Sequence, residues 1–252
     1  MRMRVAAGGR RSVGRVVCGV LVAACGSSLS PAKSAEEGDY RYHAGEFAEA
    51  ASFYEDACDG GEGEACTNLG GMYALGEGVE QDLKVASDYY ARACQQKNMR
   101  GCSMLGDSYA EGKGVPQDHK RALELFEQAC AGGHPVACGD YGVALWRGRG
   151  VSKDPARGRT ALQKSCNARN GAGCFYLGVL LRMGDDGVEK DPAAAEKYLR
   201  QGCLLEAREA CAYLAKHKEA LAREQLGEEG PEVDESPAEA EPSDAKPEGD
   251  EK

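Results

Sequence analysis

The sequence lacks the motifs of several common enzyme classes. It contains no HExxH zinc motif, no GxSxG turn, no phosphate-binding P-loop and no CxxC redox motif. Its abundant glycines recur in turn-like positions rather than in a GxGxxG unit after a strand. The four histidines fall at unrelated positions of the repeat described below: His43, His119, His134 and His217. We therefore predict no catalytic residue, no metal site and no cofactor.

Basic residues are scarce relative to acidic ones. The chain has 31 lysines and arginines against 41 aspartates and glutamates, a formal net charge of −10. Removing five arginines with the N-terminal segment described below leaves a charge near −15 (−10 − 5). Such a protein repels the phosphates of nucleic acids and the headgroups of anionic lipids, so neither is an expected partner.

Much of the negative charge lies in the C-terminal residues 224–252. They hold 12 acidic residues, two basic residues and four prolines, with almost no large apolar side chain. We expect this acidic tail to be disordered, because it cannot bury enough apolar surface to offset the entropy lost on ordering. It serves either as a solubilising spacer or as an arm that binds cations or a basic partner.

Long apolar runs are also missing. Residues 16–24 form a run of nine apolar residues, which is too short to span a bilayer. Five arginines precede this run, a pattern typical of an export signal over residues 1–24. The run ends in Val22-Ala23-Ala24-Cys25, which resembles the lipobox of bacterial lipoproteins and implies lipidation of Cys25. Gly26 then implies an outer-membrane lipoprotein, periplasmic or surface-exposed. The alternative is ordinary cleavage after Ser34, which would release a soluble secreted or periplasmic protein.

Five cysteine pairs recur with a fixed spacing. The two cysteines of a pair are eight positions apart, and the first cysteines are separated by 36, 36, 36 and 37 residues. A period of this length is typical of one supersecondary unit copied in tandem. In an oxidising compartment, a cysteine pair in every copy predicts one disulfide in each unit. The predicted bridges are Cys58–Cys66, Cys94–Cys102, Cys130–Cys138, Cys166–Cys174 and Cys203–Cys211.

Two other interpretations of the cysteines are less consistent with this pattern. Unpaired cysteines can act as small buried apolar residues, but that role does not require the same spacing five times. Structural zinc sites use four ligands with gaps of two to four residues, whereas each unit here offers two thiols with a gap of seven.

Helical spacing surrounds each cysteine pair. Four residues before the first cysteine stands a tyrosine, phenylalanine or leucine, and four residues after the second stands a glycine or alanine. This pattern predicts two helices in each unit, packed closely where the small residue lets the backbones approach. Gly-x-Gly-Val turns follow one helix, and an aspartate suited to N-capping precedes the next. The predicted caps are Asp82, Asp118, Asp154 and Asp191.

These residues carry a family resemblance. The pattern Leu-Gly-x-x-Tyr-x-x-Gly-x-Gly-Val-x-x-Asp, followed by Ala-x-x-x-Tyr/Phe-x-x-Ala, resembles the Sel1-like repeat, a relative of the tetratricopeptide repeat. With its cysteine pairs, the chain resembles the secreted cysteine-rich Sel1-repeat proteins of bacteria over residues 40–216. The resemblance implies an all-α, right-handed αα solenoid of about five disulfide-stapled repeats. It also implies a protein- or peptide-binding scaffold and leaves the partner unknown.

The chain therefore divides into four predicted segments. Residues 1–24 are the signal peptide, and residues 25–39 are the lipidated N-terminus and a flexible tether. Residues 40–223 form the solenoid, and residues 224–252 are the acidic tail. We expect a monomer attached to the membrane through Cys25.

The binding surface is predicted from positions that vary within the constant scaffold. In αα solenoids the first helix of each unit lines the concave face, and that helix is expected to start at the second cysteine. Side chains two and nine residues after this cysteine differ between copies. Trp146, the single tryptophan, replaces a small residue of earlier copies and is either a binding anchor or the filler of a packing gap. The candidate residues are Asn68, Met104, Asp140, Tyr176, Trp146 and Arg147.

An enzymatic alternative comes from the same resemblance. Some cysteine-rich Sel1-repeat proteins are catalogued as β-lactamases or penicillin-binding proteins, whose chemistry needs an activated serine near a lysine, or a metal. A Ser-x-x-Lys sequence occurs at residues 30–33, in the expected tether. There Pro31 is expected to keep Ser30 and Lys33 off one helical face. Ser-Asp-Asn and Lys-Thr-Gly are absent from the sequence, so we regard this match as chance.

Overall fold

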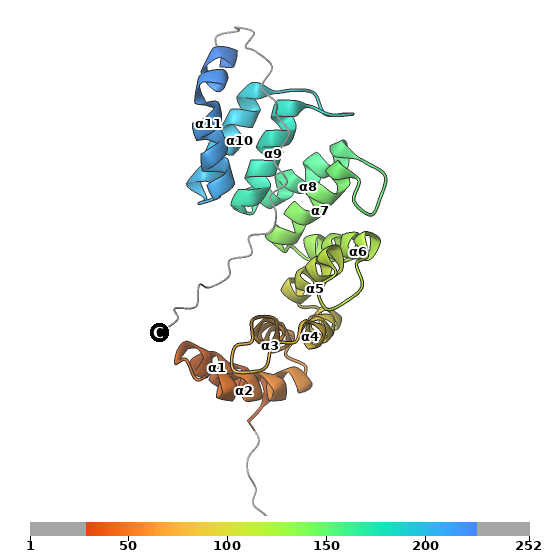
Figure 1. Cartoon of the computed structure of the whole chain (residues 1–252), viewed down its shortest axis with the longest axis vertical. Helices are drawn as coiled ribbons and strands as arrows, with labels where there is room; N and C mark the ends of the chain where they lie inside the picture. Colours follow the sequence, from red (N-terminus) through yellow and green to blue (C-terminus); the bar gives the residue numbers. More distant parts are fainter. Residues whose placement is uncertain (1–28, 226–252) are drawn as a thin grey trace, which may run out of the picture.

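The fold consists of paired helices stacked in one direction. The computed structural model describes residues 29–225, and within this range every regular element is a helix. Figure 1 shows the helices as a curved column with α1 and α2 at one end and α11 at the other. The predicted all-α solenoid is thereby confirmed. The helix bounds are α1 Pro31–His43, α2 Phe47–Asp59, α3 Gly63–Leu75, α4 Leu83–Gln95, α5 Met99–Glu111, α6 His119–Ala131, α7 Pro135–Arg147, α8 Pro155–Asn167, α9 Gly171–Met183, α10 Pro192–Leu204 and α11 Arg208–Gln225.

The helix ends follow from the capping residues in the sequence. All four predicted aspartates accept hydrogen bonds at the start of an even-numbered helix; Asp82, for example, accepts from the N–H groups of Lys84 and Val85. The helices α3, α5 and α7 each end at a glycine in the left-handed region, with φ between 70° and 77°. These glycines are Gly76, Gly112 and Gly148.

Each odd-numbered helix packs most closely against the even-numbered helix that follows it. The glycine four residues after the second cysteine makes this approach possible. A Cβ atom built on Gly70 would lie 2.6 Å from the ring of Tyr90, and one on Gly106 would lie 2.6 Å from Phe126. The sequence predicted these contacts, because the same small and large residues recur in every copy.

The five cysteine pairs are disulfides with Cα–Cα distances of 4.5–4.7 Å. Each joins the last turn of an even-numbered helix to the first turn of the next odd-numbered helix. The bridges therefore link successive hairpins across the less closely packed junctions. Each still lies inside one unit when a unit is counted from an even-numbered helix to the next odd-numbered one, as the sequence suggested. A repeat period fixes the length of a unit but not its starting point, so both ways of counting describe the same chain.

The solenoid begins earlier than predicted. Residues 31–39 were expected to belong to a flexible tether, but they form most of α1, which packs on α2. Gly38 in α1 lies against Tyr54, where an added Cβ would be 2.7 Å from the ring. Ser34 stands four residues before Gly38, the position of the second cysteine in later copies. This serine removes the cysteine that marks the other units.

The odd-numbered helices line the concave side of the column. Among helices two apart in the chain, the main contacts join α3 to α5, α7 to α9 and α9 to α11. Elements on the inner side of a curved stack lie closer together than those on the outer side, so these contacts identify the inner face (Figure 1). Within the described residues, no helix is long and apolar enough to cross a membrane.

Candidate functional site: the concave face

A pocket of about 520 Å³ lies on the concave face between α1, α3 and α5. This volume is within the usual range of ligand pockets. Two of the predicted binding residues, Asn68 and Met104, line it, whereas the α1 contribution was not predicted. The wall consists of Asp39, Tyr42, His43, Tyr54, Glu64, Thr67, Asn68, Gly71, Met72, Leu75, Glu77, Tyr90, Arg100 and Met104.

Two carboxylates in this wall are held by tyrosine hydroxyls. The Tyr54 hydroxyl donates a hydrogen bond of 2.7 Å to Asp39, and the Tyr42 hydroxyl donates one of 2.8 Å to Glu77. Asn68 bridges the two sides of the pocket, because its amide nitrogen lies 3.5 Å from Asp39 and its oxygen accepts from Arg100. The carboxylates therefore have defined orientations.

Both tyrosines remain protonated donors at neutral pH. The hydrogen bond to Glu77, followed by burial, raises the pKa of Tyr42 above its ordinary value. Burial, followed by the hydrogen bond to Asp39, raises the pKa of Tyr54 well above its ordinary range. A phenol beside a carboxylate resists ionisation because the second negative charge would be repelled. The pocket thus keeps neutral aromatic walls beside the two carboxylates.

The concave face changes character from one junction to the next. Each junction between two copies combines two positions. The first is five residues after the second cysteine of one copy, and the other is two residues after the second cysteine of the next copy, with Ser34 in the place of that cysteine in the first copy. These combinations are Asp39 and Asn68, Gly71 and Met104, Asp107 and Asp140, and Val143 and Tyr176. Along the column these pairs of side chains are polar, apolar, acidic and apolar in turn, although the backbone that carries them repeats.

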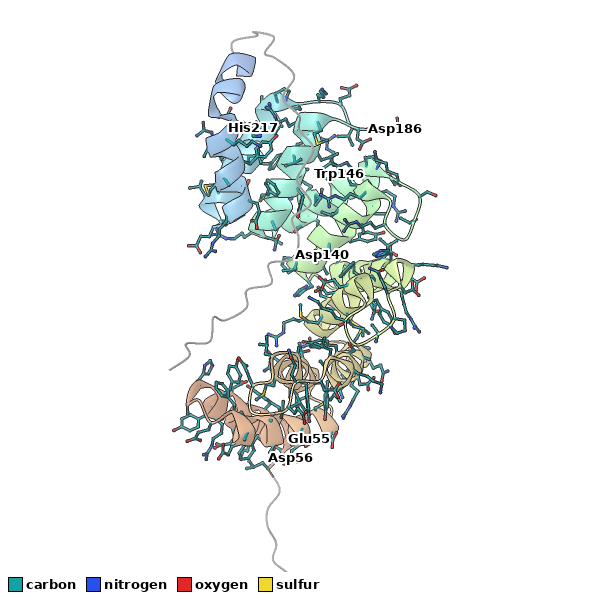
Figure 2. All side chains as sticks on the ribbon, in the orientation of Figure 1. Glu55, Asp56, Asp140, Trp146, Asp186 and His217 are labelled. Atoms are coloured by element: carbon teal, nitrogen blue, oxygen red, sulfur yellow. A yellow bond between two sulfur atoms is a disulfide. The ribbon has the colours of Figure 1, made fainter. Side chains whose placement is uncertain are left out.

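The third combination brings two carboxyl groups together. Burial, the neighbouring Asp140 and then Glu111 raise the pKa of Asp107 to about 8, although Lys113 acts in the opposite direction. Burial and Glu111 raise the pKa of Asp140 to about 7. Figure 2 places Asp140 midway along the column. This predicted binding residue is half-buried and thus partly accessible.

Trp146 is not a surface anchor. It is 5% exposed, and its indole nitrogen donates a hydrogen bond of 2.9 Å to Asp185 in the loop before α10. That loop contains the one-residue insertion, and Lys153 also binds Asp185 at 2.8 Å. Figure 2 shows Trp146 within the upper half of the column, beside the loop that carries Asp186. Of the two roles expected for Trp146, its burial fits the filler of a packing gap between two repeats and not the binding anchor.

The two remaining candidates lie side by side. The Arg147 guanidinium lies over the ring of Tyr176, 5.9 Å from its centroid. Both side chains are partly exposed, so this pair remains available on the face of α7 and α9.

The serine–lysine sequence lies at the start of α1. Ser30 is the N-cap, Pro31 occupies the first helical position and Lys33 is exposed in the first turn. Pro31 was expected to keep Ser30 and Lys33 off one helical face; it begins the helix, and Ser30 stands before it as the N-cap with an extended backbone. Among the described residues, no group of three histidine, cysteine or acidic side chains is arranged to hold a metal ion.

Comparison with known protein families identifies the repeat in this chain. The sequence model of the Sel1 repeat matches residues 63–98, 100–134, 135–170 and 171–206. The chain belongs to the Sel1 repeat family. The boundaries of these Sel1 repeats coincide with the hairpins α3–α4, α5–α6, α7–α8 and α9–α10, so four of the five disulfides link one matched repeat to its neighbour or to the flanking α11. No curated protein matches the chain.

Solved Sel1 structures share the fold. A Sel1 repeat protein from Oxalobacter formigenes is 28% identical with a TM-score of 0.67, over 73% of this chain and 74% of that one. A protective antigen of uropathogenic Escherichia coli strains, described as displaying an SLR fold, is 27% identical with a TM-score of 0.69. The match covers 75% of this chain but only 42% of the antigen, so the Sel1 chain spans less than half of that relative.

The pocket residues on α1 were missed for a definable reason. Three residues separate α1 from α2, whereas seven separate α3 from α4. The shorter loop moves Gly38 and Tyr54 out of the spacing seen in later repeats, and Ser34 removes the cysteine signal. The remaining clue was Gly38 itself, since its packing against Tyr54 repeats the contact of Gly70 with Tyr90.

Proposed function

We propose that this Sel1 repeat protein is a scaffold that binds an extended segment of a partner protein on its concave face. The observation that carries this proposal is the pocket between α1, α3 and α5. It is built by successive hairpins, and the polar and apolar character of its walls changes along the register. Sel1 repeats generally mediate protein–protein interaction, which supports the same function.

A substitution at Gly71 tests whether this pocket binds the partner. Gly71 lines the pocket, and a Cβ atom built on it has no neighbour within 4 Å. Gly71→Phe should therefore fill the pocket without disturbing the helix, while Gly71→Ala should leave the pocket open. Replacing a helical glycine by alanine also stabilises the helix by roughly 0.5–1 kcal/mol, and phenylalanine is a better helix former than glycine too, so neither variant should unfold.

The readout is the binding of peptides selected from a random heptamer display library on the disulfide-bonded protein. We expect Gly71→Phe to lower the affinity for the selected peptides at least ten-fold and Gly71→Ala to change that affinity less than two-fold. Equal binding by the wild type and Gly71→Phe, or failure to select any peptide, would contradict the proposal.

The proposed location is the bacterial cell envelope. Five disulfides fit an oxidising compartment. The export signal and the lipobox-like Cys25 lie outside the described residues, so lipidation and the membrane attachment of a monomer rest on the sequence. Cys25→Ala should move the protein from the membrane fraction to the soluble fraction. Soluble wild-type protein beginning at Ala35 would instead support cleavage after Ser34.

A further inference from the structure

The first hairpin carries a strong excess of negative charge. Residues 31–62 contain nine acidic and two basic residues, a net charge of −7 (2 − 9). Its only arginine, Arg41, is bound to Glu37 at 2.8 Å and Glu46 at 2.6 Å, so it does not neutralise the pocket. A surface of this sign attracts a positively charged partner.

Within the pocket, the negative charge is concentrated at two carboxylates. Glu64 and Arg100 occupy the same position in successive repeats, two residues before the second cysteine, and they cancel in the sum of the formal charges that line the pocket. Asp39 and Glu77 remain. In the described part of the chain neither is paired with a lysine or arginine, and both are positioned by tyrosine hydroxyls.

The lining around these carboxylates suits a long cationic side chain. Tyr42, Tyr54 and Tyr90 contribute aromatic side chains to the lining, and Met72, Met104 and Leu75 contribute apolar ones that can contact methylene groups. Burial also raises the pKa of Tyr90, so that ring stays neutral like the other two. Arginine and lysine combine an apolar stem with a charge that binds carboxylates and aromatic rings.

We propose that the pocket between α1, α3 and α5 receives an arginine or lysine side chain of the partner segment, whose charge is bound by Asp39 and Glu77. This inference rests on the proposed function and adds the chemical class of the partner. Hydrogen bonds from Tyr42 and Tyr54 fix the two carboxylates before the partner arrives, so little ordering remains on binding.

The test compares two blocked tripeptides, acetyl-Gly-Arg-Gly-amide and its citrulline counterpart, which has nearly the same shape but no charge. Nuclear magnetic resonance of tyrosine-labelled, disulfide-bonded protein in 0.15 M salt reports on Tyr42, Tyr54 and Tyr90. We expect the arginine peptide to shift these resonances in a saturable way and the citrulline peptide to leave them in place.

The double variant Asp39→Asn/Glu77→Gln keeps an acceptor for each tyrosine hydroxyl and removes both charges. This double variant should bind the arginine peptide at least ten-fold more weakly than the wild type does. Glu49→Gln/Asp56→Asn changes the net charge equally at exposed positions of α2 and should change the affinity less than two-fold. Equal shifts by the citrulline peptide, equal losses in the two double variants, or no shift at all would overturn the inference.

The peptide selection distinguishes a failure of the cationic side-chain inference from a failure of the proposed scaffold function. Selected peptides that do not bind Gly71→Phe and contain no arginine or lysine would support the scaffold function. They would contradict the inference that the pocket receives a cationic side chain. Selected peptides with a basic residue at one fixed position, sensitive to both Gly71→Phe and the charge-removing double variant, would support the two together.

Discussion

Three turns place a residue other than glycine in the left-handed region of backbone conformation. Lys97, Arg169 and Glu206 have φ of 61°, 65° and 64°, at the position where Gly61 and Gly133 stand in the other turns. This conformation costs a residue with a Cβ atom about 1–2 kcal/mol, partly offset by the greater freedom of glycine in the unfolded chain.

Glycine at these positions should therefore stabilise the protein. We expect Lys97→Gly and Arg169→Gly each to raise the free energy of unfolding by about 0.5–1 kcal/mol, measured by urea denaturation with the disulfides intact. The reverse change, Gly61→Ala, should lower it by about 1 kcal/mol. Destabilisation by both glycine variants would show that the lysine and arginine side chains make a larger contribution than their backbone strain.

The carboxyl groups of Asp107 and Asp140 predict a dependence of stability on pH. Because the pKa values in the folded protein are raised to about 8 and 7, the folded state binds more protons than the unfolded state between pH about 4 and pH about 8. The contribution of the pair to stability is therefore complete at low pH and is lost as the pH rises through 7 to 8.

Asp107→Asn should remove this loss. At pH 8.5 we expect the variant to be more stable than the wild type by more than about 1 kcal/mol, which corresponds to less than one pKa unit. At pH 4 the two proteins should differ little, and Asp56→Asn, at an exposed position on α2, should leave the pH profile unchanged. Parallel pH profiles for the wild type and Asp107→Asn would contradict the assignment.

At the scale of helices, the repeating residues predicted most of what the structure contains. The capping aspartates, the glycine contacts and the cysteine pairs recur in the copies from α3 to α10, and each has a local physical role. The starting point of a unit was not predictable from the period, because the tighter packing of α3 on α4 than of α4 on α5 is a property of the folded chain. Trp146 was ambiguous for a similar reason, since its partner Asp185 lies 39 residues away in a loop that only one copy lengthens.

The disulfides stabilise the junctions between hairpins. Each closes a loop of nine residues, for which the chain-entropy relation gives about 2.6 kcal/mol. We expect Cys94→Ser/Cys102→Ser to lower the free energy of unfolding by about this amount, measured by urea denaturation. The single variants serve as controls for the change of side chain. A loss near zero would mean that packing of α4 on α5 already fixes this junction.

The last two helices should be required to close the stack. Leu199 of α10 is fully buried against Gly178 of α9, and burying a leucine contributes roughly 1.5–3 kcal/mol. A chain that ends at Val188 should expose this face of α9 and aggregate or lose thermal stability, as seen by light scattering and calorimetry. A chain that ends at Gln225 should keep its thermal midpoint, because the residues it loses are mostly acidic and carry almost no large apolar side chain to pack. A monomeric 1–188 protein with an unchanged midpoint would contradict the one-dimensional stacking of repeats.

In the whole molecule, the residues that build the scaffold are separate from the residues that vary on its concave face. Capping aspartates, glycine contacts and disulfides repeat along the column from α3 to α10, whereas the concave face changes from Asp39 and Asn68 at one end to Val143 and Tyr176 towards the other. The first of these levels was hidden from the sequence by Ser34 and a shortened loop. A repeat that departs from its family pattern can therefore hold the residues that select a partner.

The disulfides also determine what happens when the protein meets a protease. Lys97 and Arg169 are exposed in turns, each between two bonded cysteines. Trypsin cutting at either residue leaves the two fragments joined through sulfur, so the nicked chain migrates as one species without reductant and as two with it. The bridges that fix the angle between hairpins thus keep the solenoid covalently whole after cleavage at its exposed turns.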